Sequence, residues 1–168
     1  MKSNVSQENF WNKLGQKKYD LFYYAEYFKR CVFLCRLFKS IVSIGTVVIT
    51  AIFMNWYNIE WVKTLCLIVI IILQGVNAFS ECLPFEKRKS EIFNIEKETS
   101  SIYIEMENDW IKIKKGEMNE NDIDELLLEY IKRYEEVYNH YFKDDALPHN
   151  RKIDATAKQE TDKYMNNL

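Results

Sequence analysis

Six polar side chains recur at helical spacing inside two apolar stretches of the sequence, where they could do hydrogen-bonding chemistry. They form two sets at positions i, i+3 and i+7, namely Ser43, Thr46 and Thr50 in the first stretch and Gln74, Asn77 and Glu81 in the second. Residues at these spacings share one face of a helix. Each set therefore predicts a polar stripe that can bind another helix or line a path for water.

The two stripes leave two interpretations open. Hydroxyl and amide groups at bilayer depth are costly unless they meet polar partners or water. In the first interpretation the stripes hydrogen-bond each other within one hairpin or hold an oligomer together. In the second, several hairpins assemble, and Gln74 and Asn77, with or without Glu81, line a pore. Two helices cannot enclose a channel, so the second interpretation requires oligomerisation.

The elements that must position these stripes are two long uncharged segments. Residues 40–59 and 64–80 contain no Asp, Glu, Lys or Arg. A membrane-spanning helix needs about 20 mainly apolar residues, and extension of the second segment to Pro84 supplies that length. We therefore expect two spans, at about 40–57 and 62–83, which form a transmembrane helical hairpin over 40–83. A buried hairpin in a soluble helical bundle is the alternative, and the adjacent uncharged segments disfavour it.

The residues between the two spans indicate a turn at a membrane surface. Trp56, Tyr57 and Trp61 have amphipathic rings that prefer the headgroup level, so we interpret them as interface anchors. Basic residues gather at the other ends of the spans, and the turn offers only Lys63; they are Lys29, Arg30, Arg36, Lys39, Lys87, Arg88 and Lys89. This asymmetry predicts that both termini are cytoplasmic.

Charge and composition argue against several other classes of protein. Residues 1–39 carry a net charge of +5 and residues 81–168 a net charge of −7, so a basic nucleic-acid-binding surface is not expected. The two histidines, His140 and His149, have no nucleophile or metal-ligand spacing beside them. With four glycines there is no phosphate-binding loop. We therefore predict a protein that is not an enzyme and that holds no cofactor and no metal.

Outside the hairpin, the sequence predicts cytoplasmic helices. Residues 1–39 are expected to form an amphipathic helix that runs into the membrane, and 84–143 a helical hairpin with coiled-coil-like spacing. Gly116 is a predicted helix cap at its turn, and residues 144–168 are predicted to be a polar tail. The positions expected to pack these helices together are Ile95, Ile102, Met106, Leu127 and Tyr134. The fold class is thus an all-α membrane protein, a transmembrane hairpin whose long cytoplasmic N- and C-terminal helices form a bundle.

This order of parts resembles the SLATT family of small bacterial proteins. The resemblance covers roughly residues 10–142. It is carried by KKYDLFYYAEYFKRC before the first span, LPFEKRKSEIFNIEKE after the second, and KKGEMNENDIDELLLEYIKRYEEVY around the cytoplasmic turn. It implies a cytoplasmic N-terminal helix, two transmembrane helices, and a long and a shorter cytoplasmic helix. No site residue can be transferred, because the family has no site motif that aligns with this sequence.

The resemblance also implies a function. Members of the family are regarded as membrane effectors of bacterial conflict systems, including antiphage defence, that oligomerise and form pores when triggered. They are associated with sensor or nucleotide-signalling proteins encoded nearby, so the expected partners are the lipid bilayer, further copies of the chain and such a sensor. The alternative is a non-enzymatic membrane anchor or scaffold whose cytoplasmic helices recruit a partner protein.

Overall fold

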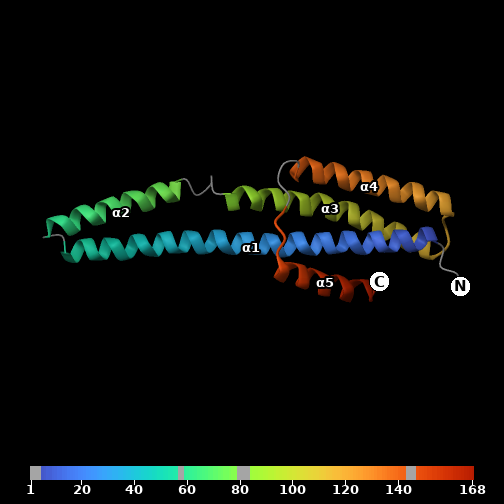
Figure 1. Cartoon of the computed structure of the whole chain (residues 1–168), viewed down its shortest axis with the longest axis horizontal. Coiled ribbons are helices and arrows are strands. Elements are labelled where there is room, and N and C mark those ends of the chain that lie inside the picture. The colour runs from blue at the N-terminus through green and yellow to red at the C-terminus, as the bar shows by residue number, and fades with distance from the viewer. Residues whose placement is uncertain (1–4, 57–58, 79–83, 143–146) are drawn as a thin grey trace. The chain divides into compact units, whose positions relative to one another are not determined.

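The computed structural model describes residues 5–56, 59–78, 84–142 and 147–168. Within these ranges, the side chains of 56, 76–78 and 84–87 are not described. The elements are α1 (Val5–Trp56), α2 (Glu60–Ala78), α3 (Pro84–Lys114), α4 (Glu120–Phe142) and α5 (Arg151–Met165) (Figure 1). No strand occurs in the described ranges, which confirms the all-helical class.

The chain divides into two compact units. One comprises Met1–Phe28 with Glu91–Leu168, and we call it the helical unit; the other comprises Lys29–Ser90, and we call it the apolar unit. Helix α1 contributes residues to both units. It continues through residues 39 and 40, where the span was predicted to begin, because no proline interrupts it. The predicted boundaries at 39/40 and 83/84 both fall within the apolar unit and stay predictions. The basic residues that flank the predicted spans thus belong to the apolar unit.

The core of the helical unit lies between α1, α3 and α4. Phe10 and Leu14 of α1, Met106 of α3 and Ile123 of α4 are at most 1% exposed. Their spacing puts one apolar face of each helix inward, and burying such a face contributes more to helix stability than intrinsic propensity does. Aromatic rings extend the contact, since Trp11 and Trp110 have ring centroids 4.9 Å apart.

A glycine-capped turn joins α3 to α4. Gly116 has a φ of +76°, a left-handed conformation that other residues adopt at a cost. Its N–H donates to the carbonyl of Ile113 at 2.9 Å, and the N–H of Glu117 donates to that of Lys112 at 3.1 Å. This pair of bonds is a Schellman motif, so the predicted cap is confirmed. The amide oxygen of Asn119 then accepts from the N–H of Asp122 at 3.0 Å and begins α4.

Helix α4 runs antiparallel along α3. Tyr130 donates to Asp109 at 2.7 Å, Arg133 binds Glu105 at 2.6 Å, and Tyr141 donates to Glu98 at 2.6 Å. As residue numbers rise on α4, those of the partners fall on α3, which fixes both direction and register. Figure 1 shows the two helices side by side, as the short predicted connection requires.

The prediction of a polar tail over 144–168 is wrong for residues 151–165, which form α5. The helix begins at Asn150, whose side chain accepts from the N–H groups of Lys152 and Ile153. Its buried face consists of Ile153, Ala157 and Thr161, spaced by four. This stripe was missed because Ala and Thr give it little hydrophobic contrast against the eight charged or amide residues of 151–165.

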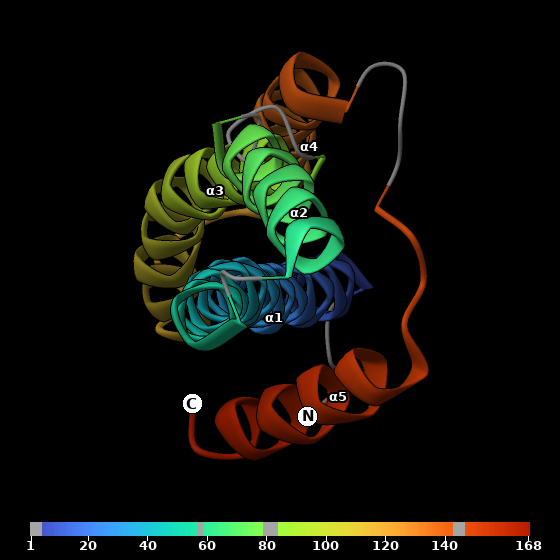
Figure 2. The ribbon, with the colours of Figure 1, turned by 90° about the vertical axis from the view of Figure 1, so that its left-hand side faces the viewer.

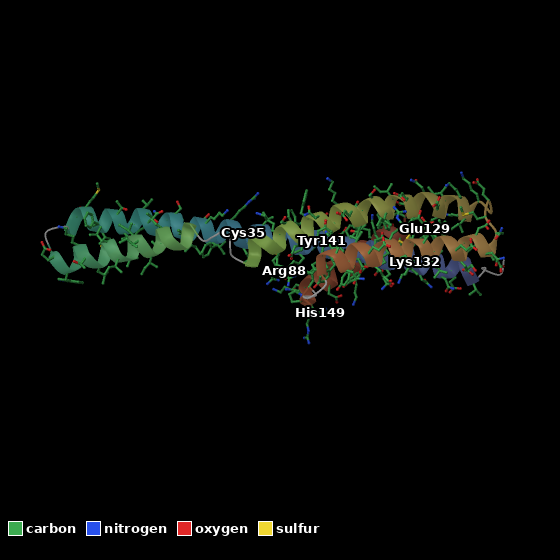
Figure 3. The ribbon with its side chains drawn as sticks, turned by 90° about the horizontal axis from the view of Figure 1, so that it is seen from above. Cys35, Arg88, Glu129, Lys132, Tyr141 and His149 are labelled. Carbon is green, nitrogen blue, oxygen red and sulfur yellow. The ribbon has the colours of Figure 1, made fainter. Side chains whose placement is uncertain are left out.

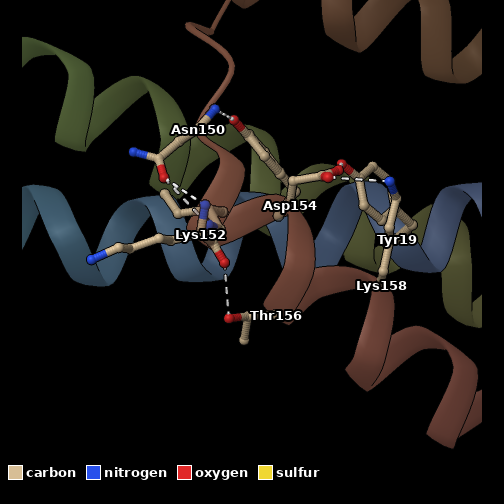
Figure 4. A network of polar contacts seen from close by, with 8 residues as sticks. Tyr19, Asn150, Lys152, Asp154, Thr156 and Lys158 are labelled. Carbon is tan, nitrogen blue, oxygen red and sulfur yellow. Dashed lines mark hydrogen bonds and ion pairs between the residues drawn. The ribbon is translucent and has the colours of Figure 1, made fainter.

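Polar contacts attach α5 and the segment before it, residues 147–150, to α1; we call this segment the leader of α5. Tyr19 donates to Asp154 at 2.7 Å, and Asp154 also accepts from Lys158 at 3.1 Å (Figure 4). Tyr23 donates to the carbonyl of Pro148 at 3.0 Å and accepts from the N–H of Asn150 at 3.1 Å. Figures 1 and 2 place α5 along α1, on the side away from α4.

In the apolar unit, α2 runs back alongside the second half of α1 (Figures 1 and 2). A Cβ atom added at Gly45 would lie 3.7 Å from Leu73 Cδ1, so the two helices approach closely at this point. Val42, Val62 and Cys66 are between 3% and 7% exposed. A narrow apolar seam therefore joins the helices, and most other side chains of the unit face outward.

Candidate functional site

The outward surface of the apolar unit is itself apolar. Ile44, Val47 and Ile71 are 64%, 67% and 69% exposed. In Figure 3 the side chains of α2 and of the α1 segment beside it are mostly carbon, whereas nitrogen and oxygen atoms crowd α3 and α4. Among the described residues, α1 is the helix long and apolar enough to cross a membrane, and 6% of its most apolar 18-residue window is buried. A core helix of a soluble protein would be mostly buried.

Two of the three hydroxyls in the polar stripe of α1 bond to their own helix. Thr46 Oγ1 donates to the carbonyl of Val42 at 2.9 Å, and Thr50 Oγ1 donates to that of Thr46 at 2.8 Å. Threonine hydroxyls commonly bond in this way to the preceding turn. Ser43 and Thr50 are exposed, and Thr46 is half-buried. The O–H donors of Thr46 and Thr50 therefore need no partner helix.

The second stripe is only partly described. Gln74 of α2 is exposed. The side chain of Asn77 and the whole of Glu81 lie outside the described residues. Of the three predicted anchors, Trp61 is 69% exposed, whereas the side chain of Trp56 and residue Tyr57 also lie outside the described part. The choice between helix packing and a water path thus stays a prediction.

The residues predicted to pack the cytoplasmic helices all lie in or beside the interior of the helical unit. Ile95 and Met106 are fully buried, and Ile102 and Tyr134 are 6% and 5% exposed. Leu127 is half-buried and packs against the same core. The packing positions of α3 were predictable from the sequence, because a spacing of three and four residues brings successive apolar side chains to one side of a helix.

Two adjoining cavities, each of about 210 Å³, lie in the helical unit, and sequence reasoning missed them. The first is lined by residues of α1, α3 and α4, and the second by residues of α1 and α4 and by the leader of α5. Asp20, Tyr24 and Tyr138 line both. The available signal was the clustering of aromatic and charged residues in KKYDLFYY, which we interpreted only as packing surface.

The carboxylate of Asp20 is the most electrostatically perturbed acid of these cavities. Burial raises its pKa, and the ammonium of Lys17, 3.3 Å away, lowers it in part. The same ammonium lies 4.5 Å from the ring centroid of Tyr134. Burial also raises the pKa of Tyr24 and of Tyr134, so both phenols are neutral at physiological pH. The site combines Lys17 and two carboxylates, those of Asp20 and Glu135, with neutral aromatic walls.

A second lysine occupies an aromatic box between α1, α3 and α5. Lys18 Nζ lies 3.6 Å from the ring centroid of Tyr164 and 4.5 Å from that of Tyr103. Burial lowers the pKa of Lys18, and the nearby carboxylate of Glu107 raises it in part. Tyr164 donates a hydrogen bond to Glu107. This cluster is a structural cation–π contact that holds α5 to the bundle.

In the described part of the chain, no group of three His, Cys, Asp or Glu side chains is placed so that it could bind a metal ion. Cys31, Cys35 and Cys66 are buried. Comparison with known proteins gave no match: no family model matches the chain, and no curated protein and no solved structure matches it.

Proposed function

We propose that this chain is a membrane effector of a bacterial conflict system, such as antiphage defence, that oligomerises and opens a pore or disrupts the inner membrane when triggered. In this proposal the segment 40–83 is a two-span hairpin and both termini are cytoplasmic. The class of system comes from the resemblance to the SLATT family. The membrane part of the proposal rests on the residues themselves.

The observation that carries the proposal is the outward apolar surface of the apolar unit. Isoleucine, valine and leucine favour the bilayer by about 0.3–0.6 kcal/mol each at the centre of a span. Exposed residues of this kind in α1 and α2 are Ile41, Ile44, Val47, Val48, Ile52, Leu65, Leu67, Ile68, Ile71 and Ile72. Monomeric soluble proteins rarely expose an apolar surface this continuous. Lipid is the medium that such a surface fits.

Gln74 supports oligomerisation. Its amide is exposed on α2 among apolar neighbours. A side-chain amide that faced lipid would lose its hydrogen bonds with water, so such residues turn toward other helices or an aqueous cavity. The O–H groups of Thr46 and Thr50 already donate to their own helix, so they are not available as donors to the amide oxygen of Gln74. A second copy or a water-filled lumen would supply what the amide needs.

The test is induced expression in a bacterium, with membrane potential and dye entry recorded together. The wild type is compared with a Gln74→Leu/Asn77→Leu variant at equal membrane-inserted amounts. We expect depolarisation and dye entry by the wild type and a loss of at least tenfold in both signals for the variant. Equal damage by both proteins would refute the lining role of the amides.

A matched control comes from the other unit. Gln16 of α1 is also an exposed glutamine, and it lies far along the helix from the apolar segment. Gln16→Leu makes the same chemical change where no pore is proposed, so it should leave the damage at the wild-type level. If Gln16→Leu also abolished damage, the loss would reflect altered folding or assembly of the helical unit.

A membrane anchor that recruits a partner is the second candidate, and one surface favours it. Phe93, Ile104 and Ile111 of α3 are 51%, 55% and 45% exposed. They are separated by about three and two helical turns, so they lie on one side of α3. An anchor predicts no toxicity on overproduction and loss of a bound partner in an Ile104→Lys/Ile111→Lys variant. Toxicity that survives this variant would favour the effector.

A further inference from the structure

The paired cavities of the helical unit are too small for most drug-sized ligands. Each has a volume of about 210 Å³, below the roughly 300–1,000 Å³ of typical ligand pockets. They share a wall made of the Asp20 carboxylate and the rings of Tyr24 and Tyr138. A molecule that filled one cavity, or extended past the wall into both, would touch the same three residues.

Fixed charges around the cavities favour a cation. Lys17 is the one basic side chain of the lining apart from His149, and two carboxylates, those of Asp20 and Glu135, stand against it. The side chains of Lys17, Asp20 and Glu135 together carry a formal charge of −1. A phosphate-bearing or other anionic ligand would meet like charge in a confined space. An ammonium ion would meet opposite charge.

The aromatic walls have the chemistry that recognises an organic cation. Faces of tyrosine rings attract ammonium groups within about 6 Å of the ring centroid. Five tyrosines line the two cavities, namely Tyr19, Tyr23, Tyr24, Tyr134 and Tyr138. The hydroxyls of Tyr19 and Tyr23 are engaged by Asp154, Pro148 and Asn150, which holds these two rings in place. The walls are therefore preorganised.

Lys17 indicates where a cation would sit. Its ammonium lies over the ring of Tyr134 at 4.5 Å and beside Asp20 at 3.3 Å, so the protein supplies its own cation to this place. The lysine stem is flexible, and its head can move outward to water while the stem stays packed. A ligand cation would then take over the carboxylate and the aromatic face.

We propose that these cavities bind a small organic cation, an amine or a quaternary ammonium ion, with Asp20 as its counter-ion and the rings of Tyr24, Tyr134 and Tyr138 as its walls. The site belongs to the helical unit and stands independently of any membrane activity. Lys17 acts as an internal competitor, because its ammonium makes the contacts with Asp20 and the ring of Tyr134 that the ligand would make.

Calorimetric titration of the full chain in a non-ionic detergent tests this proposal. The probes are choline, putrescine and spermidine, with a neutral isostere of choline in which carbon replaces the quaternary nitrogen, and inorganic phosphate. We expect saturable binding of at least one cation and at least tenfold weaker binding of the neutral isostere. No saturable cation binding to the helical, folded chain, equal affinity for the isostere, or tighter binding of phosphate would each overturn the proposal.

Variants locate the binding. Asp20→Asn should lower the affinity for the cation at least tenfold. Asp162→Asn makes the same change at an exposed position of α5 and should leave the affinity within twofold of the wild type. Lys17→Met removes the competitor and should tighten binding by threefold or more. Tyr138→Leu changes a side chain that is 40% exposed, so it gives a reading even where Asp20→Asn fails to fold. Unchanged affinity in both Asp20→Asn and Tyr138→Leu would overturn the assignment.

Discussion

The helical unit buries large apolar side chains that the apolar unit leaves exposed. In the helical unit Ile95, Met106 and Ile113 are fully buried, whereas in the apolar unit Ile44 and Ile71 are more than 60% exposed. Apolar surface turned inward stabilises a fold in water, and apolar surface turned outward does so only in another medium. The two halves of α1 therefore differ in which apolar side chains they bury, although one helix contains both.

Polar side chains bond within a single helix in both units. In the apolar unit Thr46, Thr50 and Thr64 each donate to a carbonyl of their own helix, and in the helical unit Thr99 and Thr161 do the same. The helical unit also has polar bonds that join separate helices, as Tyr130 does with Asp109 and Arg133 with Glu105. Threonine bonds within one helix are therefore no sign of a membrane segment, and the contrast between the units rests on apolar exposure.

The largest expected effect is the loss of the helical unit when a charge enters its core. Met106 is fully buried between α1, α3 and α4, so Met106→Asp should destabilise the unit by about 4 kcal/mol or more. Thermal unfolding followed by circular dichroism measures this. Ser101→Asp, on the exposed side of the same helix, is the control and should change stability by no more than about 0.5 kcal/mol. Similar melting of both variants would contradict the assigned core.

The next effect separates two isoleucines of similar exposure. Ile71 of α2 is 69% exposed and Ile104 of α3 is 55% exposed. Ile71→Lys should oppose membrane insertion by about 3 kcal/mol, whereas Ile104→Lys faces water and should leave insertion unchanged. The membrane-bound fraction after alkaline extraction is the measurement. If both variants insert like the wild type, the exposed face of α2 does not meet lipid and the contrast between the units fails.

Sequence reasoning reached the helices wherever apolar residues were large and regularly spaced. Two features could be predicted from the sequence, the apolar stripe of α3 from Ile95 to Ile113 and the turn at Gly116, because spacing and backbone conformation are local properties. Helix α5 could not be predicted in this way, because Ala157 and Thr161 are too weakly hydrophobic to mark an apolar stripe. Its order depends on contacts with Tyr19 and Tyr23, more than 120 residues away in the chain.

The cavities could not be predicted for a related reason. Asp20 and Lys17 read as an ordinary pair on an exposed helix face, and only packing against α3 and α4 brings Thr99, Tyr134 and Tyr138 around them. No single-helix pattern contains that information. The polar stripe of 43, 46 and 50 was visible as a pattern, yet its hydrogen bonds to the same helix depend on hydroxyl rotamers that spacing leaves open.

A smaller effect compares two glycines of the helical unit. Gly116 has positive φ and a Cβ there would be strained, so Gly116→Ala should destabilise the unit by about 1 kcal/mol. Gly15 is helical, and a Cβ there would lie 3.5 Å from Met165 Cε, an ordinary contact. Gly15→Ala should therefore stabilise by up to about 1 kcal/mol. Chemical denaturation of the two variants gives the measurement, and shifts of the same sign would contradict the assigned turn.

The smallest effect concerns the attachment of α5 at high pH. Burial and the hydrogen bond to Glu107 raise the pKa of Tyr164 from 10.0 to about 12. Because the folded-state pKa lies above the unfolded one, the stabilisation from this phenol is complete below about pH 10 and is lost as pH rises toward 12.

Hydrogen exchange of the α5 amides, compared between the wild type and Tyr164→Phe, measures that loss. The wild type should lose α5 protection across this interval. Tyr164→Phe should begin with lower protection at neutral pH, since Glu107 loses its donor, and should then change less on raising the pH. Tyr19 and Tyr130, whose pKa values are also raised, are present in both proteins, so any decline that they cause at high pH is common to the two curves. Parallel curves for the two proteins would mean that the Tyr164 phenol does not hold α5, and that the Lys18 box and Tyr19 hold it instead.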